Sequence, residues 1–451
     1  MNPRDENSPL LFGLDERPPL AQSLTAALAH LLAIVGAIAT APLLIAQGLG
    51  LGVAHTTYLI ASALIVSGIA TFIQVYRFGP IGSGMLSVQG TSFAFVGAFI
   101  YAGLALKQQH DDAQVLGILL GTAACGGIGT MLASLILQRL QRIITLNVAG
   151  IVVFLLGLSL VQVAFNNLQF TAATATANNE PAMLVWLQAL LVIAAIIFFS
   201  SRNNPWLKLG SICLGLLVGV GFAALTGGLN AQLPEPIAHF TFVQFAPFPL
   251  AFDGLVFLML LPIFLVTITE SIGDLTATAV LSRQPAQGDA YWRRIRGGIL
   301  ADGFNVTLAA ACGTFPNTTF SQNNGVIRLT GVASRFVGIL LAGLLLLLGC
   351  IPLVSALFQL LPGGVLHGAT GLMFAMILLS GWRILRQQAN QRRSMVMLAA
   401  ASVSALLLTQ TARVSAALEL AVPEYILLLT NFPVATGAVI AMLWEALSPP
   451  R

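Results

Sequence analysis

The chain has 451 residues, of which 57% are hydrophobic and only 8% are charged. Because about a quarter of the residues of a soluble domain are normally charged, this composition excludes an ordinary water-soluble protein and indicates many membrane spans. The net charge of +4 arises from 20 Lys and Arg against 16 Asp and Glu. These basic residues stand in short clusters between apolar runs, a pattern typical of membrane orientation that excludes a surface for nucleic acid.

Long apolar runs follow one another along almost the whole chain. A helix needs about 20 apolar residues to cross a bilayer. Runs that meet or approach this length occupy residues 23–45, 56–76, 114–138, 144–165, 184–200, 207–226, 250–280, 296–312, 334–360, 361–381, 393–411 and 423–445. We expect each run to form one membrane-spanning helix.

Two further stretches, residues 84–106 and 313–332, join an apolar part to a part rich in Gly, Ser, Thr and Asn. Such irregular chain cannot satisfy its own backbone hydrogen bonds in lipid. Counting both as broken spans predicts an all-α polytopic membrane protein with fourteen transmembrane segments, arranged as two inverted repeats of seven. The broken third and tenth segments, with short strands in them, correspond between the repeats, and in transporters of this design such segments mark the binding site.

The distribution of Lys and Arg predicts the orientation in the membrane. Cytoplasmic loops are enriched in these residues, and with the N-terminus inside, most of the 20 fall in cytoplasmic loops or tails, with Lys107 and Arg413 as exceptions. The first 20 residues carry both charge signs and lack the apolar core of a cleavable signal peptide. We therefore expect both termini to be cytoplasmic.

Three acidic residues, Glu270, Asp274 and Asp302, fall where the apolar runs place the bilayer interior. A charged side chain there costs about 2.5–3.5 kcal/mol on insertion scales. Glu270 and Asp274 are four residues apart and share one helix face, so their charges repel and proton binding near neutral pH becomes favourable. The alternative is that these acids only pair with basic neighbours to hold the helix bundle together.

Two other polar residues have a structural interpretation. His30 has apolar neighbours on both sides, and such a histidine more often packs or makes a helix–helix hydrogen bond than binds a ligand. Arg328 stands near the cytoplasmic end of the second broken stretch. We expect its side chain to reach water or a loop carbonyl, while a substrate contact is the alternative.

Residues 321–331, SQNNGVIRLTG, match a known pattern: Gln, Glu or Pro, then Asn-x-Gly, four variable residues, Thr, and finally Arg, Lys or Gly. The chain thereby resembles the nucleobase-ascorbate transporter family, also called the nucleobase:cation symporter family. The fixed positions are Gln322, Asn323, Gly325, Thr330 and Gly331. Further family motifs are similar to QGTSF at 89–93, TESIGD at 269–274 and ADG at 301–303, and His30 matches the first-segment histidine.

The resemblance implies a homodimer in the lipid bilayer whose subunits each have a core domain that moves against a gate domain. The core domain comprises segments 1–4 and 8–11, and the gate domain comprises segments 5–7 and 12–14. The corresponding parts are a cytoplasmic N-terminal tail at 1–22, core at 23–138, gate at 139–226, core at 250–360, gate at 361–445 and a cytoplasmic C-terminal tail at 446–451.

The resemblance also implies the roles of individual residues. Glu270 and Gln322 would hold the base in a bidentate manner, and the main chain at Phe93 and Ser321 would add hydrogen bonds. This is chemically apt, because a purine dione presents N–H donors beside C=O acceptors, which a carboxylate and an amide can match. Ser92 takes the place of Asn in some xanthine-selective relatives and leaves more room. Supporting residues would be His30, Gln89, Asn323, Asn324, Gly325 and Thr330.

These features predict a secondary active transporter that takes up xanthine or uric acid with protons across the bacterial inner membrane by an elevator-like movement. Gln322 and Asp274 stand where uracil carriers usually have Glu and His, which is similar to the xanthine and uric acid branch. Glu270 is the first candidate for the proton, with Asp302 and Asp274 as others. No cofactor or metal is expected, although sodium coupling stays open.

Three alternatives are open. The first is a symporter of the same family for uracil or another nucleobase. The second is a sulfate- or bicarbonate-type anion transporter with the same inverted-repeat architecture, which Arg328 would suit but the acidic residues oppose. The third is an intramembrane enzyme, and the sequence contains neither an HExxH nor a GxSxG motif.

Overall fold

The fold is seen in a computed structural model, which describes residues 10–137, 145–177, 181–227, 240–388, 390–410, 430 and 433–447. Its helices are α1 (Leu20–Gly48), α2 (Val53–Tyr76), α3 (Val96–Leu106), α4 (Asp112–Leu135), α6 (Leu146–Ala177), α7 (Ala182–Ser200), α8 (Pro205–Leu209), α9 (Ser211–Leu225), α10 (Gly254–Leu281), α11 (Gly288–Ala311), α12 (Gln322–Thr330), α13 (Arg335–Gly349), α14 (Pro352–Gln359), α15 (Gly363–Arg386), α16 (Gln391–Leu408) and α19 (Pro433–Leu447). The two strands are β1 (Gln89–Thr91) and β2 (Asn317–Thr319).

Long apolar helices dominate the described part of the chain. In this part, seven are long and apolar enough to cross a membrane: α1, α2, α4, α6, α7, α10 and α15. The protein is therefore a mainly helical, multi-pass membrane protein. The number of fourteen segments stays a prediction. Residues 1–9, the loop arginines Arg139, Arg142 and Arg413, residues 423–429 and residues 448–451 lie outside the described residues.

One expected span is bent. Residues 334–360 were expected to form one helix, but they form two, α13 and α14, whose axes differ by 74°. Pro352 stands at the first position of α14, and because proline has no backbone N–H it begins helices more readily than it continues them. Just before the bend, the backbone of Gly349 lies so close to Ile65 of α2 that a Cβ would clash.

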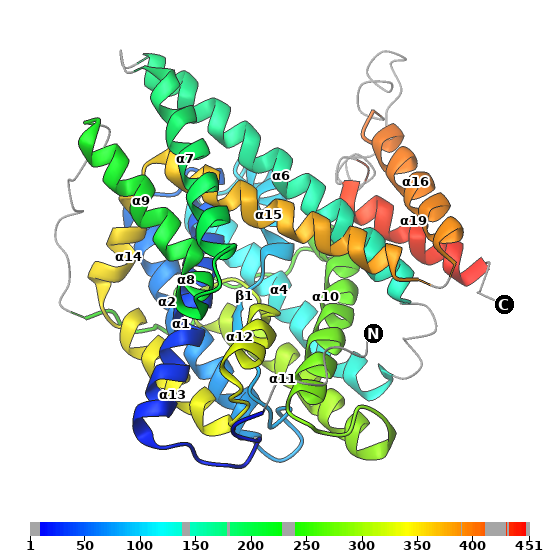
Figure 1. The fold of residues 1–451 in the computed structure, drawn as a ribbon. Helices are drawn as coiled ribbons and strands as arrows, with labels where there is room; N and C mark the ends of the chain where they lie inside the picture. Colours follow the sequence, from blue (N-terminus) through cyan, green and yellow to red (C-terminus); the bar gives the residue numbers. More distant parts are fainter. Residues whose placement is uncertain are drawn as a thin grey trace.

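The stretches expected to be interrupted each contain a three-residue strand followed by a short helix. β1 leads through a 3-10 helix, Phe93–Phe95, into α3, and β2 leads into α12. The strands pair antiparallel, with Gln89 opposite Thr319 and Thr91 opposite Asn317. Figure 1 shows β1 and α12 near the middle of the molecule. Gly90 must be glycine, because a Cβ there would overlap the ring of Phe320.

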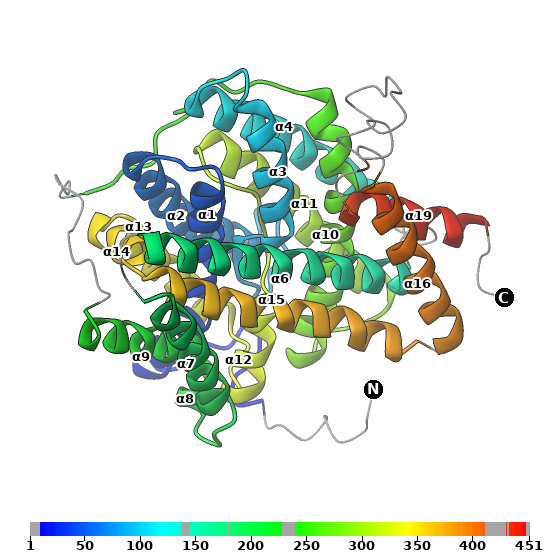
Figure 2. The same cartoon turned by 90° about the horizontal axis from the view of Figure 1, so that it is seen from above.

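Pairs of helices pack closely through small residues. α6 lies beside α15 along much of its length (Figure 2), and a Cβ on Gly157 of α6 or Gly381 of α15 would overlap the opposite helix. Such close backbone approach is a common way for helices to associate in membranes. α7 and α9 pack at one end of this pair and α16 and α19 at the other, while α11 packs against α4 and α13 against α2.

Candidate functional site

Helix α10 presents two carboxyl groups about one turn apart. Glu270 and Asp274 are partly buried, whereas Gly273 between them is exposed, and a Cβ there would meet no atom within 4 Å. Within the described chain, neither carboxyl group makes a hydrogen bond or an ion pair. This face of α10 therefore offers carboxylate oxygens that the protein itself does not use.

Helix α12 begins with an equally open face. Ser321, Gln322 and Gly325 are all exposed, and a Cβ on Gly325 would meet no atom within 4 Å. Ser321 precedes the helix as its N-cap, and its carbonyl accepts from the Asn324 N–H at 3.0 Å. Arg328 is exposed in the last turn of α12, at the opposite end of the helix from Gln322.

Asn324 joins these two helices. Its side-chain amide donates to the main-chain carbonyl of Asp274 at 3.2 Å, and its side-chain oxygen accepts from the hydroxyl of Thr278 at 2.7 Å. The two expected substrate-binding helices are thus held together directly beside the second acid of α10. The structure therefore places Asp274 of α10 and the start of α12, which includes Gln322, in one region of the molecule.

Asn323 ties α12 to the chain that leads into β1. It is only 1% exposed, and its amide donates to the carbonyl of Leu86 at 2.6 Å. Its side-chain oxygen has no hydrogen-bond partner among the described residues. The side chain of Asn323 therefore ties α12 to this chain from the buried side, and its support of a binding site stays a prediction.

Asp302 of α11 lies in a buried hydrogen-bond network. Gln74 of α2 donates to its carboxyl group at 3.2 Å, and the Thr319 hydroxyl donates to both carboxyl oxygens at 3.4 Å. The Gln89 amide in turn donates to the Thr319 hydroxyl at 3.0 Å. The strand pair thereby connects Gln89 of the QGTSF motif to Asp302 of the ADG motif.

Sequence reasoning missed two members of this network, Gln74 and Thr319. Gln74 also donates to the carbonyl of Gly298 at 3.3 Å and accepts from the Ser83 N–H at 3.1 Å, so both ends of its amide are used. The sequence could have indicated Gln74, because burying a Gln side chain near the end of an apolar span costs free energy unless its amide is hydrogen-bonded. Thr319 had no such signal, since its role depends on strand register.

Ser92 and Phe93 follow β1 directly. The Ser92 hydroxyl accepts from the Ala94 N–H at 3.3 Å, and its own N–H donates to the Pro316 carbonyl at 2.9 Å, so Ser92 caps the turn after the strand. The Phe93 ring stands edge-on to Phe374 of α15, with centroids 5.5 Å apart. Phe93 therefore lies where the segment after β1 meets α15.

Two residues predicted to support the site, His30 and Thr330, do not contact the other predicted site residues through hydrogen bonds within the described chain. His30 is completely buried, and neither ring nitrogen has a hydrogen-bond partner in the described part of the chain, so the helix–helix hydrogen bond considered for it is absent. The Thr330 hydroxyl donates to the Val326 carbonyl at 2.9 Å and accepts from the Val332 N–H at 3.2 Å. Thr330 thus supports the C-terminal end of α12, the end opposite Gln322.

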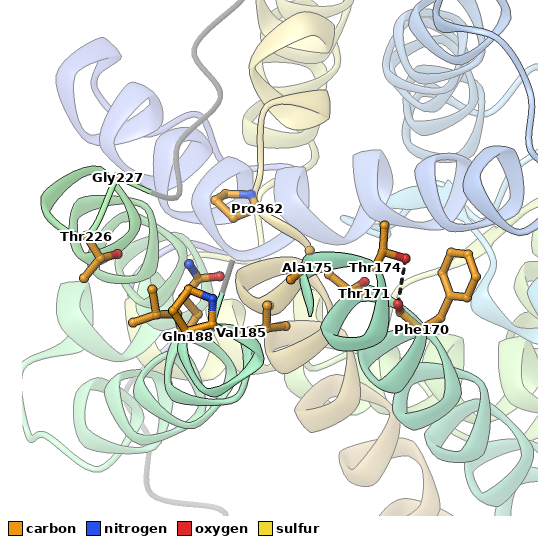
Figure 3. A pocket seen from close by; sticks show the side chains of 13 residues that line it. Phe170, Thr171, Thr174, Ala175, Val185, Gln188, Thr226, Gly227 and Pro362 are labelled. Carbon is orange, nitrogen blue, oxygen red and sulfur yellow. Dashed lines mark hydrogen bonds between the residues drawn. The ribbon is translucent and has the colours of Figure 1, made fainter. Parts of the chain in front are cut away.

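A separate cavity of about 380 Å³ lies between α6, α7, α9 and the start of α15 (Figure 3). Its wall includes the buried amide side chain of Gln188 and the hydroxyl of Thr174, which donates to the Phe170 carbonyl at 2.9 Å. None of the predicted site residues lines this cavity. The acids and amides discussed above therefore form a region of their own on α10, α11, α12 and the strand pair.

Comparison with known proteins gives consistent results. The family model described as "Permease family" matches residues 21–414. Xanthine permease XanP of Escherichia coli (strain K12) is 39% identical over 451 residues, covering 99% of this chain and 96% of the relative. The uric acid-xanthine permease of Emericella nidulans is 32% identical over 427 residues, covering 88% of this chain and 74% of the relative.

Among solved structures, the transmembrane domain of the cyanobacterial bicarbonate transporter BicA matches with a TM-score of 0.59. The match covers 95% of this chain and 99% of that domain at 13% identity, which is evidence for the fold alone. The sequence relatives cover nearly the whole chain, and the family match includes every motif carried by α10, α11, α12 and β1. The chain belongs to the nucleobase-ascorbate transporter family of membrane permeases.

Proposed function

We propose that this protein is a secondary active transporter that takes up xanthine, uric acid or both together with protons. The observation that carries the proposal is that α10 and α12, which Asn324 joins, each present an unused polar group: the Glu270 carboxyl has no partner within the described chain, and Gln322 is exposed. The names of XanP and of the uric acid-xanthine permease support xanthine or uric acid as the substrate.

In this proposal Glu270 accepts an N–H of the base, and the Gln322 amide both donates to a carbonyl and accepts from a second N–H. Ser321 and Phe93 contribute main-chain groups, and Ser92 shapes the end of the strand beside them. Neither Gly325 nor Gly273 has a neighbour within 4 Å of an added Cβ. An open position on each helix suits a flat heterocycle, which these groups would recognise through hydrogen bonds.

The three acidic residues differ in whether their carboxyl groups have hydrogen-bond partners in the described chain. The carboxyl groups of Glu270 and Asp274 are without protein partners in the described chain, whereas that of Asp302 accepts hydrogen bonds from Gln74 and Thr319. We assign proton coupling to Glu270, which would contact the substrate directly. Asp274 and Asp302 are the other candidates for carrying the proton. A carboxyl that faces substrate can link its own protonation to binding, because the ionised form accepts the N–H of the base.

The same proposal includes the larger architecture. Two inverted repeats of seven segments would place β1 and β2 near the middle of the bilayer of a bacterial inner membrane, with both termini cytoplasmic. The core domain, with α10 to α12 and the strand pair, would move against a gate domain that includes α6, α7, α9, α15 and α16. The homodimer that the family resemblance implies is part of the same proposal.

The test is uptake of labelled xanthine and uric acid by cells that lack their own purine carriers, with unlabelled xanthine, uric acid, uracil, guanine, ascorbate, sulfate and bicarbonate as competitors. Inhibition by unlabelled xanthine and uric acid alone is the expected result. Inhibition by sulfate or bicarbonate, without inhibition by purines, would replace the proposal with anion transport. Sodium-free medium separates the coupling ions, since proton-coupled uptake persists there.

A further inference from the structure

The chain before α1 is bound to the turn that connects α12 and α13. Residues 10–17, here called the N-terminal strap, run alongside residues 331–335, and Phe12 forms a parallel bridge with Val332. Ala333 donates its N–H to the Phe12 carbonyl at 3.0 Å, and Arg335 donates its N–H to the Leu14 carbonyl at 3.0 Å. In Figure 1 the strap belongs to the dark-blue chain below α12 and α13.

The strap completes the C-terminal end of α12. Gly331 caps this helix in the left-handed conformation, with a φ of 67° that favours glycine. The carbonyl of Gly331 accepts from the N–H of Leu11 at 2.8 Å and from that of Phe12 at 3.2 Å. Carbonyl groups at a helix end lack partners within the helix, so the strap supplies hydrogen bonds beyond the last position of the family motif.

One side chain of the strap reaches the interior. Leu14 is 5% exposed and belongs to a buried apolar cluster that includes residues of α10 and α11 and of the chain before β1. The members nearest in sequence to the predicted site are Ile268 and Leu275 of α10, Ile299 of α11 and Met85. Ile268 and Leu275 flank the segment with Glu270 and Asp274, and Ile299 is three residues before Asp302.

Charged and polar contacts fix the strap to the start of α13. Asp15 and Arg335 form an ion pair at 3.1 Å, and the Arg17 guanidinium stands over the Phe336 ring, 4.2 Å from its centroid. The Ser334 hydroxyl donates to the Glu16 carbonyl at 2.6 Å. Exposed ion pairs stabilise little by themselves, so we attribute the hold of the strap to Leu14 and to the main-chain hydrogen bonds.

We propose that the N-terminal strap is a positioning element of the transport site, with Leu14 as its anchor. It joins α10, α11 and α12, the three helices that carry the predicted acids and Gln322, without touching the substrate. Loss of the anchor would let these helices separate and would weaken purine binding. The substrate part of this inference rests on the proposed function, whereas the mechanical part does not.

The experiment compares Leu14→Ser with Leu11→Ser, because Leu11 lies in the same strap but its side chain is 61% exposed. Leu14→Met serves as a conservative rescue, since methionine has a similar volume and packs adaptably. Purified full-length protein is examined by hydrogen–deuterium exchange, and the same variants are assayed for labelled xanthine uptake after their amounts in the membrane are matched.

We expect Leu14→Ser to increase amide exchange in α10, α11 and α12 and to raise the KM for uptake by about fivefold or more, as for other couplings between distant sites. Vmax per transporter should change less, and Leu11→Ser and Leu14→Met should behave like the parent. Unchanged exchange in these helices in Leu14→Ser overturns the strap as a positioning element, and so does an unchanged KM in an active transporter.

The hydrogen–deuterium exchange measurement tests the strap even if the substrate is not a purine. If Leu14→Ser increases exchange in α10 to α12 while no form of the protein transports a purine, the proposed function has failed and the strap has not. If Leu14→Ser does not accumulate in the membrane, the milder Leu14→Ala is measured in its place, with the same expectations at smaller size.

Discussion

The side-chain amide of Asn324 donates to the main-chain carbonyl of Asp274 at 3.2 Å, so a residue of the family motif on α12 holds the backbone of α10 beside its second acid. Because Thr278 donates to the same side chain at 2.7 Å, the amide of Asn324 is engaged at both ends. Asn324 therefore contributes to the spacing between Gln322 and the acids, although its own side chain need not contact the substrate.

Replacing Asn324 with Ala should weaken substrate binding. The change removes both hydrogen bonds between α10 and α12, and losing about 1.4 kcal/mol of binding free energy corresponds to a tenfold change. We expect KM for xanthine uptake to rise by about tenfold. Thr25→Ala is the control, because the exposed Thr25 hydroxyl donates only within its own helix, to the Gln22 carbonyl at 2.9 Å. Equal KM values for both variants would show that Asn324 does not set the site.

Replacing Glu270 with Gln should separate binding from proton coupling. The amide keeps the size of the side chain but cannot release a proton. In the parent protein, we expect uptake to increase when the medium is more acidic than the cytoplasm, and Glu270→Gln should lose both this response and accumulation against a gradient. The measurements are the initial rate of xanthine uptake and its steady-state accumulation, at external pH values from about 5 to about 8.

Asp289→Asn is the matched control for this carboxyl-to-amide change, since Asp289 is exposed in the first turn of α11. It should retain the response to pH. If Glu270→Gln still accumulates xanthine as the parent does, Glu270 is not the coupling group, and the same measurements on Asp302→Asn and Asp274→Asn would identify which of the other acids is.

Replacing Gly325 with Ala should reduce transport without reducing stability. The added methyl group meets no atom of the protein within 4 Å, and Ala in a helix is favoured over Gly by about 1 kcal/mol. The methyl group would instead occupy the open face beside Gln322. We expect an unchanged or higher melting temperature in detergent and a KM raised by about fivefold, a change of roughly 1 kcal/mol.

Gly343→Ala in α13 is the control, because an added Cβ there also meets nothing within 4 Å but lies outside the α10–α12 face. It should gain similar stability and keep normal uptake. A normal KM in Gly325→Ala would contradict a substrate surface at this part of α12.

Replacing Gln74 with Leu should destabilise the fold. The change leaves the Asp302 carboxyl, the Gly298 carbonyl and the Ser83 N–H without their Gln74 partner, and each buried group left unsatisfied costs about 1–3 kcal/mol. The expected result is a clear loss of melting temperature in detergent. Gln47→Leu on the exposed side of α1 is the control. Similar melting temperatures for the two variants would show that the Gln74 network adds nothing to stability.

Much of the helix content followed from the apolar runs, because a span of lipid demands a long hydrophobic helix wherever it occurs. The two irregular stretches were also visible, since their Gly, Ser, Thr and Asn content cannot be satisfied in lipid. The register in which β1 and β2 pair could not be predicted from the sequence. Each strand has only three residues, and which residue faces Thr319 depends on how the two halves of the chain meet.

Other features were hidden for a different reason. Residues 1–22 were expected to form a cytoplasmic tail outside the core domain, yet Leu14 is buried and α1 already begins at Leu20. The bend between Gly349 and Pro352 was hidden inside an apolar run of ordinary composition. In both cases contacts with distant parts of the chain decide the local structure, and such contacts leave no periodic pattern in one sequence.

The pairing of β1 with β2 has a consequence for biogenesis. Gln89 meets a partner strand that is synthesised more than two hundred residues later, so β1 enters the membrane before its partner exists. Until then its backbone N–H and C=O groups must be hydrated or bound by the insertion machinery, because lipid cannot satisfy them. The pairing of β1 with β2, and with it the proposed transport site, can therefore form only after the second half of the protein has been synthesised.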